Sequence, residues 1–208
     1  MQMLEALILY GPPASGKDTI SQLVSRLDPR YVLFRKIKSG AGSTGTYRVI
    51  SEGRLATMRA AGRVQQESRR YGNTYVVDKD QLDYFASAGR RPMLHMGDLP
   101  GVVQLKSYGR PARWQTVLLW APPDVTHARL AGRRDTNVRA RMEVWIQTVE
   151  ELLSSPEALF DFIVNTGDVS ALDAAQAILK GDVGSPVATI ESGVLRDALT
   201  AASAYIPR

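Results

Sequence analysis

Nine consecutive residues near the start of the chain carry the clearest chemistry in the sequence. The segment Gly11–Thr19 reads GPPASGKDT, which matches the pattern of two glycines with four residues between them and a lysine after the second. In such a loop the glycines let backbone N–H groups surround phosphate oxygens, and the lysine adds a charge that can follow a transferring phosphoryl group. We therefore predict an ATP-phosphate site made of Gly11, Pro12, Pro13, Ala14, Ser15, Gly16, Lys17, Asp18 and Thr19.

Asp18 departs from the usual form of this loop, which has serine or threonine after the lysine. The usual hydroxyl ligates Mg²⁺, whereas a carboxylate near phosphates needs a metal ion or Lys17 to compensate its charge. We therefore predict that Asp18 is a Mg²⁺ ligand, directly or through water. The alternative is an acidic residue that only complements the dipole of the following helix.

The segments around this loop predict how it is held. Leu4–Tyr10 is an almost continuous apolar run, typical of a parallel strand buried on both faces, and Thr19–Leu27 has a helical pattern. Further strands are expected at Tyr75–Asp78, Pro92–Met96, Thr116–Trp120 and Phe160–Asn165. Further helices are expected at Asp80–Ala88, Asp124–Arg129, Val138–Leu153 and Val169–Leu179. This alternation predicts an α/β three-layer sandwich with a mainly parallel sheet.

The order of these segments predicts one main domain over residues 1–180. Residues of about 33–90 contain the polar, glycine-rich run GAGSTGT and are expected to form an inserted lobe, and residues of about 129–141 a short lid. Residues 181–208 form a C-terminal extension with a short amphipathic stretch at Ile190–Ala201. This stretch is expected either to cap the domain or to contact another subunit, as in a homodimer.

Composition removes several functional classes. The chain of 208 residues has no cysteine, so thiolate metal sites and cysteine nucleophiles are excluded. Its formal net charge of +5 suits a small polyanion as well as nucleic acid, but no nucleic-acid-binding motif accompanies the charge, so we expect no nucleic-acid partner. No signal-like or membrane-spanning apolar run occurs, so a cytoplasmic location without membrane contact is expected. His95 and His127 have no acid or nucleophile at suggestive spacing and are interpreted as structural.

From the loop onward, residues 4–180 resemble the guanylate kinase family. The lobe spacing of that family is reproduced by Arg35, Lys38, Gly40 and Tyr47, its Tyr-Gly pair by Tyr71-Gly72, and its later Asp by Asp98. The segment APPDVTHARLAGRR resembles the entry to the family's lid, and Val138–Met142 resembles the lid exit.

The resemblance implies a transferase that uses ATP and Mg²⁺ to phosphorylate a small molecule that already carries a phosphate. It implies that Arg35, Lys38, Tyr47 and Tyr71 hold the phosphate of this acceptor, with Lys38 in the place of an arginine. It also implies a catalytic set composed of Lys17 with the lid arginines Arg133, Arg134 and Arg141. Such residues make chemical sense, because phosphoryl transfer depends mainly on positioning and electrostatics.

The positions that read guanine in that family are less well reproduced. Its base-reading Glu falls on Gln65, and only Asp98 is retained, so GMP itself is doubtful as the acceptor. The sequence Gly-Lys-Asp also resembles the ribose 1,5-bisphosphate phosphokinase branch. We therefore rank a nucleoside monophosphate first and a sugar phosphate or specialised metabolite second. A non-catalytic protein-binding module of the same fold is the alternative from another class.

Overall fold

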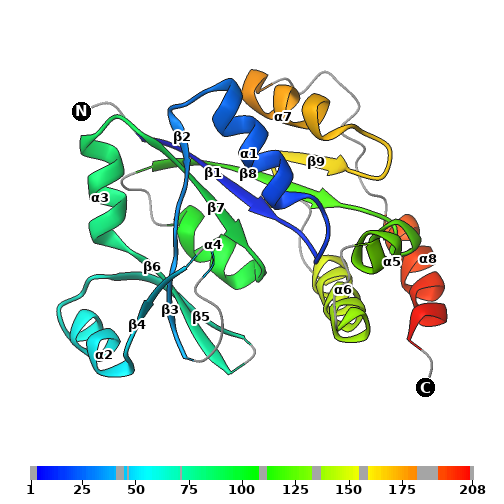
Figure 1. Cartoon of the computed structure of the whole chain (residues 1–208), viewed down its shortest axis with the longest axis horizontal. Coiled ribbons are helices and arrows are strands. Elements are labelled where there is room, and N and C mark those ends of the chain that lie inside the picture. Colours follow the sequence, from blue (N-terminus) through cyan, green and yellow to red (C-terminus); the bar gives the residue numbers. More distant parts are fainter. Residues whose placement is uncertain are drawn as a thin grey trace.

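A central parallel sheet forms the middle layer of the protein (Figure 1). The computed structural model describes residues 4–40, 45, 47–70, 72–107, 112–132, 137–154, 159–181 and 192–206. The strands of the sheet are parallel in the order β2 (Tyr31–Leu33), β7 (Arg91–Met96), β1 (Leu4–Tyr10), β8 (Ala112–Trp120) and β9 (Phe162–Asn165).

The central strand β1 divides the core into two parts. Alternate side chains of a strand point to opposite faces, so Leu7 and Leu9 pack on one face and Ile8 and Tyr10 on the other, all fully buried. The first face is covered by α1 (Lys17–Leu27) and α7 (Ala171–Lys180). The second is covered by α3 (Lys79–Ser87), α4 (Leu99–Ser107), α6 (Val138–Leu153) and α8 (Ser192–Ala202). The predicted three-layer α/β sandwich is confirmed.

The C-terminal helix α8 is part of this packing. Leu195, Ala198 and Ala202 are buried in the main core, and α8 contacts both α6 and α5 (Pro123–Gly132). After α8, the short helix η2 (Ser203–Tyr205) stacks the Tyr205 ring on His127 at 4.7 Å between centroids. The amphipathic stretch predicted at the C-terminus therefore caps the domain.

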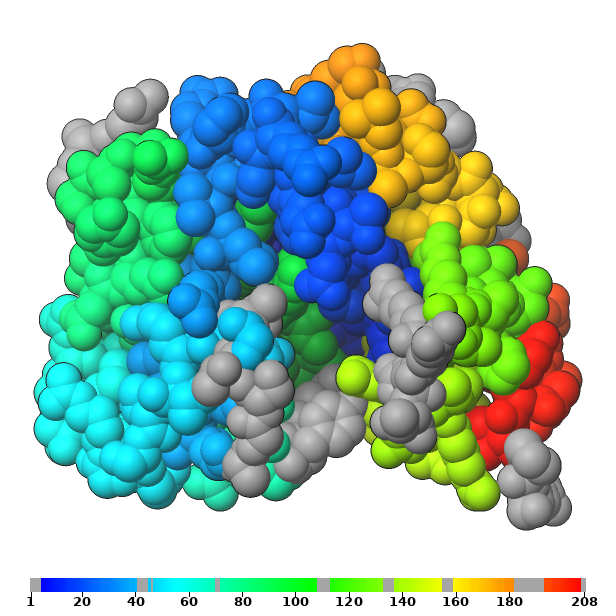
Figure 2. Space-filling view, in the orientation of Figure 1, coloured from blue at the N-terminus to red at the C-terminus, as the bar shows by residue number. Residues whose placement is uncertain are grey.

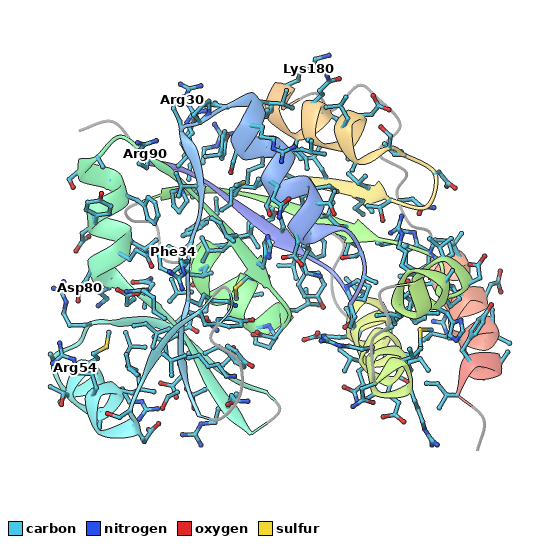
Figure 3. All side chains as sticks on the ribbon, in the orientation of Figure 1. Arg30, Phe34, Arg54, Asp80, Arg90 and Lys180 are labelled. Carbon is cyan, nitrogen blue, oxygen red and sulfur yellow. The ribbon has the colours of Figure 1, made fainter. Side chains whose placement is uncertain are left out.

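A second, smaller sheet lies beside the first. Its strand order is β4 (Arg48–Ile50), β3 (Ile37–Ser39), β6 (Asn73–Asp78) and β5 (Val64–Arg70), with α2 (Glu52–Ala60) packed on it through a small core of Ile37, Leu55 and Val76. Phe34 lies where the chain leaves the central sheet for this one (Figure 3), and its ring packs on Phe85 of α3. The predicted strand Tyr75–Asp78 therefore belongs to the second sheet and not to the central one.

Among the residues described, no helix is both long and apolar enough to cross a bilayer.

Candidate phosphate-binding site

The turn between β1 and α1 has the backbone shape of a phosphate-binding loop. Gly11 and Gly16 have φ angles of 153° and 90°, in the region that glycine reaches without steric cost. A Cβ atom on Gly11 would overlap the carbonyl oxygen of Leu119 in β8, so the loop lies directly against the sheet. Glycine is therefore required at residue 11 for both reasons.

Lys17 spans the inside of this loop. Its Nζ donates to the carbonyl oxygens of Gly11 (2.7 Å) and Pro12 (2.8 Å) and to Oγ of the buried Ser15 (3.1 Å). Lys17 is also the first residue of α1, whose N-terminal N–H groups carry partial positive charge. The ammonium group and the helix end thus concentrate positive charge at the place where the motif predicts phosphate.

A cavity of about 200 Å³ opens beside the loop. In Figure 2 the hollow lies between the second sheet, in cyan, and α6, in yellow-green. The loop, the second sheet, the end of β7 and α6 all contribute side chains to it. The lining consists of Gly11, Pro13, Lys17, Lys36, Tyr47, Ser68, Tyr75, His95, Met96, Gly97, Asp98, Arg141, Val144 and Thr148.

Three cations from different segments face this cavity. Lys17 comes from the loop, Lys36 from the residue before β3, and Arg141 from the first turn of α6. Lys36 is buried, and its Nζ lies 3.6 Å from the sulfur of Met96. Positive charge therefore surrounds the cavity, as expected for a site that binds anions.

Phenol rings line the side of the cavity formed by the second sheet. Tyr47 and Tyr75 pack with their centroids 5.1 Å apart, and Ser68 pairs in register with Tyr75 across β5 and β6. These hydroxyl-bearing side chains can donate hydrogen bonds to phosphate oxygens. The same surface also supplies aromatic area against which a planar group can pack.

His95 lies at the end of β7, close to the loop. Its Nδ1 is 3.4 Å from Oδ1 of Asp18, and its buried Nε2 has no hydrogen-bond partner among the described residues. Burial lowers the pKa of His95 to about 4, against the opposing effect of Asp18, while Lys17 and Lys36 add to the lowering. His95 is therefore neutral near neutral pH, and the cations of the site are lysine and arginine.

Two polar side chains, those of Gln66 and Asp98, lie close together beside the cavity. Strand β5 has a bulge between Val64 and Gln66, and bulges redirect side chains. Gln66 is 1% exposed, and neither its Oε1 nor its Nε2 has a hydrogen-bond partner within the described part of the chain. A Cβ atom on Gly101 would lie 2.8 Å from Gln66 Nε2 and 2.5 Å from Asp98 Oδ1, so the amide and the carboxylate lie near the same point.

An unpartnered buried amide is costly, since each unsatisfied polar group loses about 1–3 kcal/mol. Gln66 lies two residues before Ser68 on β5, so both side chains face the side of the sheet that lines the cavity. The geometry therefore makes Gln66 a candidate for contact with a bound molecule.

The structure brings six of the predicted site residues to the cavity. These are Gly11, Pro13, Lys17, Tyr47, Asp98 and Arg141. Pro12, Ala14, Ser15 and Gly16 complete the loop, and Asp18 and Thr19 are exposed at the start of α1. Tyr71, Arg133 and Arg134 lie outside the described residues.

Three other predicted residues do not line the cavity. Arg35 is exposed and its Nη2 donates to the carbonyl oxygen of Tyr47 (3.1 Å). Lys38 is buried in β3, opposite Tyr75, so it lies on the same face of the second sheet as the cavity. Gln65 occupies the bulge, beside Gln66.

Sequence reasoning missed Lys36, Ser68, Tyr75, His95 and Thr148, which all line the cavity. Tyr75 had a usable signal, because it lies in a segment predicted to be a strand, four residues after the Tyr71-Gly72 pair. The other four had no distinctive spacing. His95 in particular was interpreted as structural, and the structure places it beside Asp18.

One carboxylate at the loop, that of Asp18, could serve as a ligand for a metal ion. Within the described ranges no three His, Cys, Asp or Glu side chains converge, so a cage made of protein ligands alone is not formed there. Mg²⁺ is commonly held by one or two carboxylates together with phosphate oxygens and water. Asp18, exposed and adjacent to Lys17, fits this second mode.

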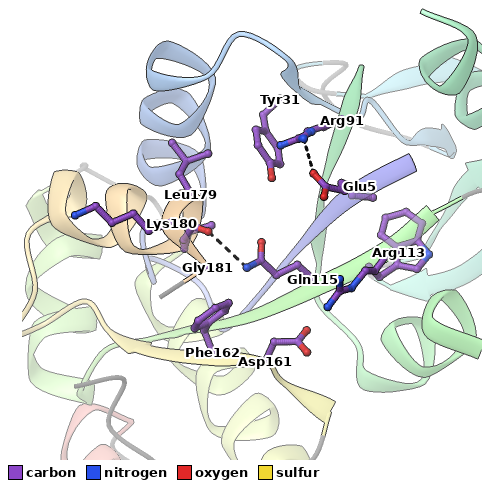
Figure 4. Close-up of a pocket in the computed structure, with 13 residues that line it drawn as sticks. Glu5, Tyr31, Arg91, Arg113, Gln115, Asp161, Phe162, Leu179, Lys180 and Gly181 are labelled. Carbon is purple, nitrogen blue, oxygen red and sulfur yellow. Dashed lines mark hydrogen bonds and ion pairs between the residues drawn. The ribbon is translucent and has the colours of Figure 1, made fainter. Parts of the chain in front are cut away.

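A larger cavity, of about 490 Å³, lies at the opposite edge of the central sheet (Figure 4). It is lined by residues at the beginnings of strands, including Glu5, Tyr31, Arg91 and Phe162, and by the end of α7. Arg91 pairs with Glu5 at 2.5 Å and lies over the Tyr31 ring at 5.3 Å. Because the phosphate loop follows the carboxyl end of β1, this cavity is separate from the site described above.

Comparison with known proteins supports the fold. No protein-family model and no curated protein matches the chain. The structure is similar to guanylate kinase from Anaplasma phagocytophilum, with a TM-score of 0.57 and 14% identity over 94% of this chain and 86% of that one. Shikimate kinase from Acinetobacter baumannii in complex with shikimate gives a TM-score of 0.43 and 16% identity over 85% of this chain and 92% of that one. At 14% identity the likeness to the guanylate kinase structure concerns the fold alone, an α/β fold with a mainly parallel central sheet.

Proposed function

We propose that the protein is an ATP-dependent phosphotransferase that moves the γ-phosphoryl group of ATP to the phosphate of a phosphorylated small molecule. One observation carries the proposal: Lys17 of the phosphate loop shares a cavity with Lys36, Tyr47, Tyr75 and Arg141. The loop can bind one polyphosphate, and the remaining side chains of the cavity can bind a second anion. Two anions facing each other across a cationic cavity are what phosphoryl transfer between them requires.

In this mechanism the protein positions two ligands and stabilises charge. Lys17 and the start of α1 hold the ATP phosphates, and Arg141 faces them from α6. Asp18 would hold a Mg²⁺ ion bound with ATP, and this ion would supply positive charge that neutralises part of the phosphate charge. Transfer is direct and in line, without a covalent enzyme intermediate. A general base is unnecessary when the acceptor phosphate is already ionised.

A nucleoside monophosphate is the acceptor that we favour. The solved guanylate kinase, whose name identifies a nucleotide kinase, is similar over most of both chains. The side chains of Gln66 and Asp98 supply both donors and acceptors beside the cavity, which suits the edge of a base. Ribose 1,5-bisphosphate or another sugar phosphate is the alternative, because hydroxyl groups could also satisfy the amide. From another class, the alternative is a protein-binding module without catalysis.

An acceptor screen with the purified protein tests the reaction. ATP consumption and the phosphorylated products should be measured with nucleoside monophosphates, sugar phosphates and non-phosphorylated sugars. The proposal predicts turnover only with phosphomonoesters, and with nucleoside monophosphates before sugar phosphates. If no acceptor is phosphorylated and the protein instead binds a peptide, the binding-module alternative is supported.

The geometry predicts that Lys36 contributes more than Lys38 to binding of the acceptor phosphate. A charged hydrogen bond contributes about 1.5–3 kcal/mol, so Lys36→Met should raise KM for the acceptor about 10- to 150-fold and leave KM for ATP nearly unchanged. Methionine keeps the apolar stem of the lysine. The matched variant Lys38→Met is expected to have a smaller effect. A larger rise in KM for the acceptor in Lys38→Met than in Lys36→Met would instead support Lys38 as the phosphate-binding residue, as the sequence spacing predicts.

The amide of Gln66 is expected to determine base selectivity. A glutamate at this position would accept hydrogen bonds from both N1–H and the exocyclic amine of guanine, whereas an amide offers one acceptor oxygen. Gln66→Glu should therefore raise kcat/KM for GMP relative to AMP about 10-fold, the equivalent of one charged hydrogen bond. Gln65→Glu is the control, because that residue occupies the bulge. Equal changes in both variants, or a change only with Gln65→Glu, would contradict the assignment.

A further inference from the structure

Arg129, near the end of α5, connects the phosphate loop to Thr166, which follows β9 at the same carboxyl edge of the central sheet. Its Nη1 donates to the carbonyl oxygen of Ala14 in the loop (3.1 Å) and to Oγ1 of Thr166 after β9 (2.9 Å). Its Nη2 donates to the carbonyl oxygen of Thr166 (2.6 Å). Thr166 is itself fixed, because it is buried and its N–H and Oγ1 both donate to the carbonyl oxygen of Trp120 (2.7 and 3.0 Å).

The residue that accepts this hydrogen bond has an unusual backbone. Ala14 has a φ of 57°, and within the described ranges no other residue except glycine has a positive φ. For a residue with a Cβ atom the left-handed conformation costs about 1–2 kcal/mol. The charged hydrogen bond from Arg129 is of the size needed to offset this cost. The loop shape at Ala14 and the contact with Arg129 are therefore linked energetically.

Arg129 extends from a helix that is held in place. On α5, Leu130 is 2% exposed and Thr126 is fully buried. The other side of α5 packs on α8, and His127 stacks on Tyr205 at an interplanar angle of 29°. The guanidinium group therefore extends from a helix in a fixed position. Its Nη1 reaches both the phosphate loop and Thr166, and its Nη2 reaches Thr166.

We propose that Arg129 is a positioning residue that keeps Ala14 left-handed and thereby keeps the phosphate loop in the shape that receives phosphate before any nucleotide arrives. Preorganisation of this kind lowers the entropy lost on binding and so increases affinity. The inference rests on the proposed function only in naming a polyphosphate as the ligand. Arg129 acts through Ala14, so its effect depends on the residue at position 14.

The test is a double-mutant cycle that measures binding by calorimetry, with inorganic tripolyphosphate and ATP as probes and no acceptor present. Arg129→Ala should weaken tripolyphosphate binding about 10-fold, the equivalent of one charged hydrogen bond. Ala14→Gly alone should have little effect, because glycine adopts a positive φ freely. Adding Ala14→Gly to Arg129→Ala should restore affinity about fivefold, since the strain of about 1 kcal/mol is removed.

Arg129→Lys provides a second variant in case the alanine variant folds poorly. Lysine keeps the charge but lacks the planar fork, so a loss of affinity is again expected, with partial recovery on adding Ala14→Gly. Arg139→Ala, on the exposed side of α6, is the control and should bind tripolyphosphate like the wild type. Unchanged tripolyphosphate affinity in both Arg129 variants, or losses that simply add in the double variants, would overturn the inference. If the cycle behaves as expected but no acceptor is phosphorylated, only the proposed function fails.

Discussion

Replacing Lys17 with alanine is expected to lower kcat for phosphoryl transfer about 1,000-fold, because the variant loses the charge that follows the transferring group. In the structure Nζ of Lys17 is held by the carbonyl oxygens of Gly11 and Pro12 at 2.7 and 2.8 Å. These neutral acceptors are weaker partners than phosphate, so the ammonium group can exchange them for ATP oxygens. Steady-state rates with the best acceptor from the screen measure the loss.

The control for Lys17→Ala is Lys180→Ala, since Lys180 is exposed at the end of α7 on the opposite edge of the sheet. This variant should retain the wild-type rate. Thermal unfolding of both variants would show whether the fold is kept. A Lys17→Ala protein that is folded and retains more than about a tenth of the wild-type kcat would refute the role of this loop in catalysis, because a loss of at least 100-fold is expected for such a group.

The central part of the fold could be predicted because its segments are long and apolar. Strand β1 was predicted with its observed bounds, Leu4–Tyr10, and α6 likewise at Val138–Leu153. A strand buried on both faces requires an apolar run, and a helix that packs on one side requires a repeat of 3.6 residues. Both requirements leave a clear pattern in the sequence. The loop motif then located the phosphate site within this framework.

Apart from β6, which was predicted in part at Tyr75–Asp78, the second sheet left no comparable pattern. Strands β3 and β4 have three residues each, too few to show an alternation. Strand β5, VQQESRR, is polar because it lies at the edge of a small sheet, and α4 begins Leu-Pro-Gly, which is unusual for a helix. Tertiary contacts determine these elements, so local patterns could not predict them.

Residues of the site could be predicted only where their spacing along the chain was enough to identify them. The loop residues are consecutive, whereas the acceptor side of the cavity combines Lys36, Ser68, Tyr75 and Met96 from separate segments. Whether Gln65 or Gln66 faces the cavity depends on a one-residue bulge, since such a slip reverses the face to which side chains point. Residue spacings along the chain cannot show where a strand has a bulge. The position of the bulge is seen only in the three-dimensional structure.

Arg141 is the residue for which sequence and structure lead to the same strong expectation. It lies one turn inside α6, where Val144 and Thr148 follow at spacings of three and seven residues and line the cavity with it. The helix is firmly placed: Asn137 caps its start through Ala140 N–H, and Trp145 is fully buried with its Nε1 donating to the carbonyl oxygen of Ala121 (3.1 Å). Arg141 therefore reaches the cavity that Lys17 also lines from a helix held in a fixed position.

A rigidly presented arginine can stabilise charge that develops during transfer more than charge in the bound substrates. Arg141→Ala is therefore expected to lower kcat about 100-fold, with KM for ATP changed less than threefold. Arg139→Ala on the same helix is the matched control, because Arg139 is exposed and pairs with Glu143. Single-turnover rates at saturating substrates separate the chemical step from product release. If KM rises and kcat stays constant, Arg141 binds the ground state and the transition state equally, and acceleration of the chemical step must then come from other residues.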